Sequence, residues 1–116
     1  MFCLLANHCD ASENKTLKRL IENRSCNGCN LSKLNLGWYN LFKVDVSWAD
    51  LSESYLVNVD LSGAELELAD FSQALFVNVN LIEAYLLHAS ISEEQLNNAR
   101  LCKTVLPDAS TSYRNC

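Results

Sequence analysis

A large apolar residue recurs at every fifth position over thirteen consecutive pentapeptides that begin at Cys29. The first place of each pentapeptide is mostly small or apolar, and the second place favours Asn or Asp. The large residues in the third place are Leu31, Leu36, Leu41, Val46, Leu51, Leu56, Leu61, Leu66, Phe71, Phe76, Leu81, Leu86 and Ile91. We expect these thirteen side chains to stack in the core.

This five-residue period matches neither the 3.6-residue period of a helix nor the two-residue period of a strand. It requires a chain that makes a short extended step, turns and repeats. The first and third residues of a pentapeptide lie on the same side of the extended step, so both can point to a common axis. Asn and Asp beside the turn bond local backbone and tolerate turn dihedrals. The chain can therefore turn often although it contains only three glycines and one proline.

The A-D-L-S-x pattern resembles the pentapeptide-repeat family, and the resemblance covers residues 29–91. It implies an all-β solenoid, a right-handed quadrilateral β-helix of about three to four coils with short capping helices at the ends. Four pentapeptides would form one square coil, so residues twenty apart would stack, as Leu41, Leu61 and Leu81 do. The segments 26–29 and 98–108 look like the ends of small cyanobacterial and thylakoid-lumen members of this family.

A helix is predicted over residues 12–24, with Ser12 or Asn14 as its N-cap. Its apolar face would consist of Leu17, Leu20 and Ile21. Because an open coil exposes unpaired backbone and core, we expect this helix to cover the first coil. The alternative is a helix that docks on a missing partner.

The repeat departs from its pattern after Ile91. Continuing it would direct Glu94 inwards, and burying that charge is costly. Ser92 and Gln95 match a capping box, which predicts a helix over about 92–99, and the repeat resumes weakly with Ala99, Leu101 and Leu106. The expected organisation is a tail and capping helix in 1–28, the β-helix in 29–91, and a short helix, weak repeats and tail in 92–116.

Charge and hydropathy limit the partners and the location of the chain. Fourteen acids and nine bases give a net charge of −5, which disfavours direct binding of nucleic acid. No uncharged apolar stretch approaches the ~20 residues of a membrane span. The apolar start, residues 1–6, is short for a signal peptide. The sequence leaves the compartment open: it is typical of a cytoplasmic protein as it stands, and of a periplasmic or thylakoid-lumen protein if a signal peptide lies upstream. The sequence leaves the oligomeric state open.

Cys26 and Cys29 are the strongest candidates for cysteine chemistry, as half of a zinc site, a redox pair or a disulfide. Zinc would need a second closely spaced pair, which Cys102 and Cys116 do not supply. A thioredoxin-like site would need a βαβ context. Because Cys29 occupies an inward position, we expect it to act as a small hydrophobic residue, with a Cys26–Cys29 disulfide in an oxidising compartment.

The other residues show no sequence spacing that is typical of a catalytic site. His8 and His88 are far apart in sequence and have no Ser or Cys partner at a recognisable spacing. The three glycines are scattered, so they form no phosphate loop. We therefore expect a protein that is not an enzyme and that binds no cofactor or metal.

Outward-facing apolar residues gather on two opposite faces of the expected coil. One face carries Trp38, Tyr55, Val57, Leu75 and Val77. The opposite face carries Trp48, Leu68, Tyr85 and Leu87. Exposed clusters of this kind mark contact surfaces. In the alternative, some of these residues cover turns or pack under the terminal helices, particularly Trp38 and Trp48.

These features favour a non-catalytic scaffold or interaction module that binds an unidentified protein partner. The alternative is an acidic DNA mimic acting on DNA gyrase or another DNA-binding protein, because residues 44–91 contain eight acids and no Lys or Arg. A third option is thiol–disulfide exchange at Cys26 and Cys29.

Overall fold

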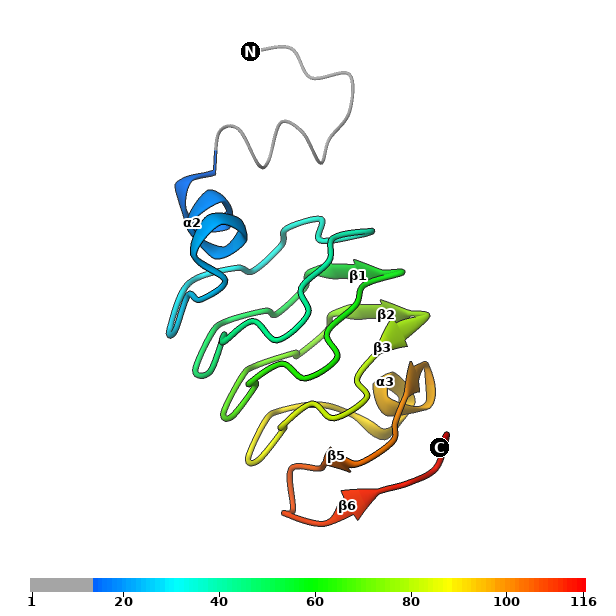
Figure 1. The fold of residues 1–116 in the computed structure, drawn as a ribbon. Helices are drawn as coiled ribbons and strands as arrows, with labels where there is room; N and C mark the ends of the chain where they lie inside the picture. Colours follow the sequence, from blue (N-terminus) through cyan, green and yellow to red (C-terminus); the bar gives the residue numbers. More distant parts are fainter. Residues whose placement is uncertain (1–13) are drawn as a thin grey trace.

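The computed structural model describes residues 14–116 (Figure 1). The alternative N-cap Ser12, together with His8, lies outside the described residues. Helix α2 (Lys15–Asn23) is capped by Asn14, whose side-chain oxygen accepts a hydrogen bond from Leu17 N at 2.9 Å. Leu17 and Leu20 are fully buried, so the apolar face of α2 covers the start of the repeats.

Residues twenty apart in sequence pair in parallel through the repeats. One column of bridges runs through Ser25, Asp45, Glu65, Tyr85 and Val105. We use these bridges to divide the chain into four layers, which are residues 25–44, 45–64, 65–84 and 85–104. Figure 1 shows the layers stacked along one axis between α2 and the C-terminus. The chain therefore returns to the same lateral position after four pentapeptides.

Short strands form where this ladder is most regular. Strand β1 (Tyr55–Val57) pairs in parallel with β2 (Leu75–Val77), and β3 (Val79–Asn80) pairs in parallel with β4 (Ala99–Arg100). Strand β5 (Thr104–Val105) pairs antiparallel with β6 (Thr111–Ser112), so the chain reverses direction at its C-terminal end. None of the helices in residues 14–116 is long and apolar enough to cross a membrane.

The turns between pentapeptides are made mainly by residues other than glycine. The fifth residue of most pentapeptides has a left-handed backbone, as at Lys33 (φ 61), Trp38 (φ 68) and Glu53 (φ 59). The Asn or Asp in the second place supports this turn. Asp50 Oδ1, for example, accepts hydrogen bonds from the backbone N of Ser52 at 2.9 Å and from its hydroxyl at 2.6 Å. These side chains supply local hydrogen bonds that stabilise the turns, although the residues at the turns are not glycine.

The core lies along the stacking axis. Of the thirteen large residues in the third place, the structure buries twelve, and Ile91 is half-buried against the same cluster. Phe71 and Phe76 meet edge to face, with ring centroids 5.4 Å apart. Ser54 occupies an inward place, where its hydroxyl donates to Leu51 O at 2.7 Å. Each inward polar group thus has a partner, as burial requires.

Helix α3 (Glu93–Asn97) interrupts the ladder in the fourth layer. Its N-terminus is a complete capping box formed by Ser92 and Gln95, and Glu94 is exposed. The buried Gln95 side chain donates from Nε2 to Phe71 O and Ala74 O, both at 2.8 Å. In the regular ladder a backbone N–H from the next layer donates to the first-place carbonyl, as Asp70 N does to Ala49 O, so the Gln95 amide replaces that donor at Ala74 O. Phe71 O also accepts the turn bond from Ala74 N at 3.0 Å. The ladder then resumes at β4.

Replacing Gln95 by leucine should lower the free energy of unfolding by about 2–4 kcal/mol, because Ala74 O and Ser92 N lose their hydrogen-bond partner and Phe71 O keeps only Ala74 N. Glu94→Gln is the matched control on the same helix, since Glu94 is exposed. Urea denaturation followed by far-UV circular dichroism measures both variants. Equal stabilities of Gln95→Leu and wild type would show that the amide does not replace the missing strand.

Candidate interaction surface

The exposed side of β1 and β2 carries four apolar residues in cross-strand register. Tyr55 pairs with Leu75, and Val57 pairs with Val77. The central residues of the two strands, Leu56 and Phe76, point into the core, so their neighbours on either side point outwards. Tyr55 is 53% exposed, Leu75 46% and Val77 44%, and Val57 is half-buried. We call these four residues the strand face.

Both tryptophans are exposed. Trp38 is 75% exposed beside the strand face, and its backbone N donates to Val57 O at 2.9 Å. Trp48 is 64% exposed on the opposite side. These exposures contradict the part of the alternative in which the two tryptophans pack under the terminal helices, although both stand at turns. Their place at left-handed turn corners points the rings away from the axis.

The second predicted apolar face is less exposed than the strand face. Leu68, Tyr85 and Leu87 are all half-buried beside Trp48. Phe42, which is 46% exposed, was absent from both predicted faces. Phe42 occupies the fourth place of its pentapeptide, and residues in that place point outwards. This position in the five-residue period could have identified Phe42 as an exposed apolar residue. The Lys43 ammonium lies 5.2 Å from the centre of its ring.

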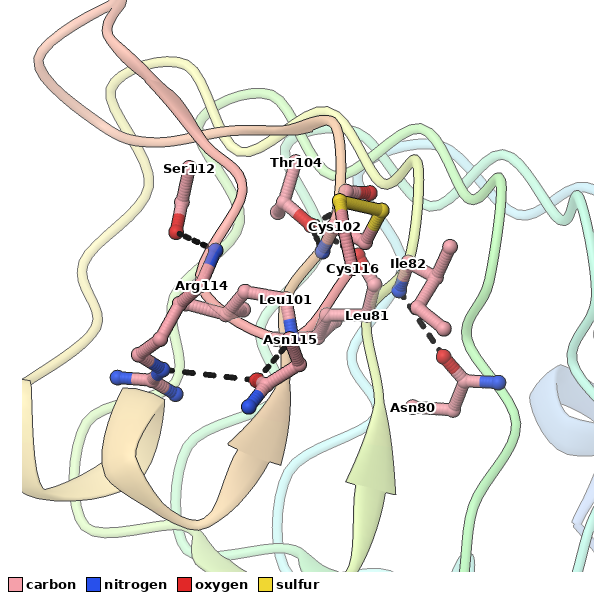
Figure 2. Close-up of a disulfide and its surroundings, with 10 residues drawn as sticks. All are labelled: Asn80, Leu81, Ile82, Leu101, Cys102, Thr104, Ser112, Arg114, Asn115 and Cys116. Carbon is pink, nitrogen blue, oxygen red and sulfur yellow. Dashed lines mark hydrogen bonds between the residues drawn. A yellow bond between two sulfur atoms is a disulfide. The ribbon is translucent and has the colours of Figure 1, made fainter.

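Four cysteines of the described chain form two disulfides. Cys26 is bonded to Cys29, the pair that the sequence offers as a local disulfide, and Cys29 also packs against the core cluster. Cys102 is bonded to Cys116, a pairing that the sequence analysis did not predict (Figure 2). The remaining cysteines, Cys3 and Cys9, lie outside the described residues.

Two features of the titratable residues in 14–116 concern metal binding and acid chemistry. No group of three His, Cys, Asp or Glu side chains is placed to hold a metal ion in this range. Hydrogen bonds from the Ser52 hydroxyl and backbone lower the pKa of Asp50, and Ser110 lowers the pKa of Asp108 in the same way. A lowered pKa keeps a carboxylate ionised at neutral pH, the opposite of what a general acid needs. His88 is exposed at a turn.

The acidic block in residues 44–91 lies on these turns. Asp45, Asp50, Asp60 and Asp70 each bond the serine two residues later. Their position is accounted for by turn formation. The alternative of a DNA mimic stays a prediction, which a gyrase supercoiling assay with added protein would test.

Comparison with known proteins defines the class of this fold. Residues 54–92 match the family model of pentapeptide repeats in eight copies. The solved structure of a pentapeptide repeat protein from Nostoc PCC 7120 shares 28% identity and a TM-score of 0.50, and the match covers 87% of this chain and 88% of that chain. The chain is thus a repeat protein with parallel 20-residue layers. Residues 54–92 contain pentapeptide repeats, and the fold of the chain is similar to that of pentapeptide repeat proteins.

Two further solved structures match with lower TM-scores. A pentapeptide repeat protein from the cyanobacterium Cyanothece 51142 is 24% identical, with 64% of this chain and 78% of that chain covered and a TM-score of 0.34. A pentapeptide repeat protein from the Arabidopsis thaliana thylakoid lumen is 28% identical, with 57% of each chain covered and a TM-score of 0.29. No curated protein matches the sequence.

Proposed function

We propose that this chain is a non-catalytic scaffold that binds a partner protein through the strand face. The proposal includes a right-handed quadrilateral β-helix, the form known for pentapeptide-repeat proteins, in which α2 and the segment from α3 to the C-terminus act as caps. The family is generally a structural or interaction fold, which supports a scaffold.

The observation that carries the proposal is the exposure of the strand face. Four apolar side chains stand side by side on paired strands whose backbone is fixed by the ladder. A rigid surface loses little conformational entropy on binding, and exposed Tyr and aliphatic groups supply the apolar centre of a typical interface. Trp38 extends this surface at one edge.

The test is affinity capture with the double variant Tyr55→Ala/Leu75→Ala. Because central interface residues contribute about 2 kcal/mol or more, we expect recovery of a specific partner to fall by roughly 30-fold or more. The matched control is Glu53→Ala/Gln73→Ala, two exposed residues at turns in the same two layers. Far-UV circular dichroism verifies that both variants are folded. Equal recovery by wild type and the strand-face variant would refute this assignment.

A further inference from the structure

A shallow groove with mostly polar lining residues runs along one corner of the stack, next to the strand face, and Trp38 lies between the two. It has a volume of about 360 Å³ and is lined by Trp38, Asn58, Val59, Asp60, Asn78, Asn80 and Arg100. We call it the asparagine groove. Its residues come from all four layers, with Trp38 in the first and Arg100 in the fourth. At about 4.8 Å between neighbouring layers, the groove extends for roughly 14 Å.

The side chains of the groove are held by one another and by the turns. Asn78 Nδ2 donates to Asn58 Oδ1 at 2.6 Å, which joins two layers. Asn80 Oδ1 accepts from Ile82 N at 3.0 Å. Asp60 Oδ1 accepts from the Ser62 backbone at 2.9 Å and also from its hydroxyl. These bonds fix the amides and the carboxylate before any ligand arrives.

Each of these side chains retains a polar atom with no protein partner within residues 14–116. The free donors are Asn58 Nδ2, Asn80 Nδ2 and the Arg100 guanidinium, and the free acceptors are Asn78 Oδ1 and Asp60 Oδ2. The groove thus offers both free donors and free acceptors, and one cation and one anion balance each other. The only aliphatic lining residue, Val59, is 1% exposed and offers no apolar pocket.

An aromatic ring stands at one end of this polar surface. Trp38 is 75% exposed, although its backbone is held by the hydrogen bond to Val57 O. Its left-handed conformation (φ 68) is unfavourable for a bulky residue, and the exposed ring gains little from packing. The ring is therefore available to stack on a ligand.

We propose that the asparagine groove binds a short carbohydrate chain. Every sugar hydroxyl both donates and accepts hydrogen bonds, which suits a groove that offers both free donors and free acceptors. The apolar C–H face of a pyranose ring packs on an indole, as other flat apolar groups do. A nucleic acid is disfavoured by the net charge of −5, and a peptide would find no side-chain pocket here. This proposal does not depend on the partner protein of the strand face.

Tryptophan fluorescence and titration calorimetry with defined trisaccharides test the proposal. The probes are maltotriose, cellotriose, xylotriose and chitotriose. We expect at least one to bind and to change the emission. Trp38→Ala should weaken that binding by about tenfold or more, since it removes the stacking surface. Asn78→Ala should weaken it as well, because it removes the amide that joins two layers.

Trp48→Ala is the matched control. Trp48 has the same turn conformation (φ 67) and is 64% exposed, but Leu68 and His88 occupy the equivalent turn positions in the next two layers, in place of asparagines. This variant should bind the sugar as wild type does. Absence of binding by all four probes would overturn the proposal, as would equal losses in Trp38→Ala and Trp48→Ala. The strand-face variant Tyr55→Ala/Leu75→Ala should retain sugar binding, so the two proposals fail separately.

Discussion

Leu61→Lys is expected to abolish the folded state. Leu61 is 2% exposed in the second layer, between the buried residues Leu41 and Leu81 of the adjacent layers. The substitution removes about 1.5–3 kcal/mol of apolar burial and places a charge on the axis, which costs several kcal/mol more. Domains of this size have a free energy of unfolding of only about 5–15 kcal/mol, so the loss approaches the total stability of the protein. Far-UV circular dichroism should show no cooperative transition in urea.

Two control variants distinguish the effect of the added charge from the effect of the buried position. Leu61→Met keeps the volume and should cost less than about 1.5 kcal/mol. Glu53→Lys introduces the same charge at an exposed turn residue with φ 59, where Lys33 of the preceding layer already adopts φ 61. This variant should remain within about 0.5 kcal/mol of wild type. Comparable destabilisation by Leu61→Lys and Glu53→Lys would contradict the assignment of inward and outward places.

Residues whose roles depend on local chain geometry could be predicted from the sequence. The third place of a pentapeptide faces the axis because of strand alternation, so Leu31 or Leu61 could be assigned inwards without coordinates. The same applies to α3, because a capping box is complete within four residues. The unfavourable inward position of Glu94 pointed to the same break in the ladder.

Contacts between segments distant in sequence could not be predicted in this way. The role of Gln95 depends on where α3 lies against Phe71 O and Ala74 O, more than twenty residues earlier. The asparagine groove appears only when four layers are stacked, because its residues are about twenty apart in sequence. Cys102 and Cys116 have no short spacing, and their pairing follows from the reversal of the chain between β5 and β6.

The reversal of the chain between β5 and β6 places the C-terminal tail against the last layer (Figure 2). Asn115 N donates to Leu101 O at 2.7 Å, and Leu101 N donates to Asn115 Oδ1 at 2.9 Å, so Asn115 Oδ1 takes the place of the carbonyl that a further layer would offer to Leu101 N. The Arg114 guanidinium donates to Leu96 O in α3 and to Ala99 O at the start of β4. The Cys102–Cys116 disulfide holds both residues in place.

Removal of this disulfide in the variant Cys102→Ser/Cys116→Ser is therefore expected to lower the stability substantially. A bridge that closes about 15 residues contributes roughly 3 kcal/mol by restricting the unfolded chain. For a domain of this size, that loss corresponds to a Tm lower by on the order of 10 °C or more. Thermal unfolding followed by circular dichroism measures the change.

The tail contacts add a second contribution that can be separated from the disulfide. Arg114→Ala keeps the bridge but removes charge-assisted bonds, and it should cost about 1.5–3 kcal/mol. If the disulfide acts partly by holding Arg114 and Asn115 against the last layer, Arg114→Ala should cost less in the Cys102→Ser/Cys116→Ser background than in wild type. Arg114→Lys is the control for charge, because lysine lacks the planar fork that reaches two carbonyls. A Tm unchanged in the double serine variant would show that the tail does not stabilise the exposed end of the ladder.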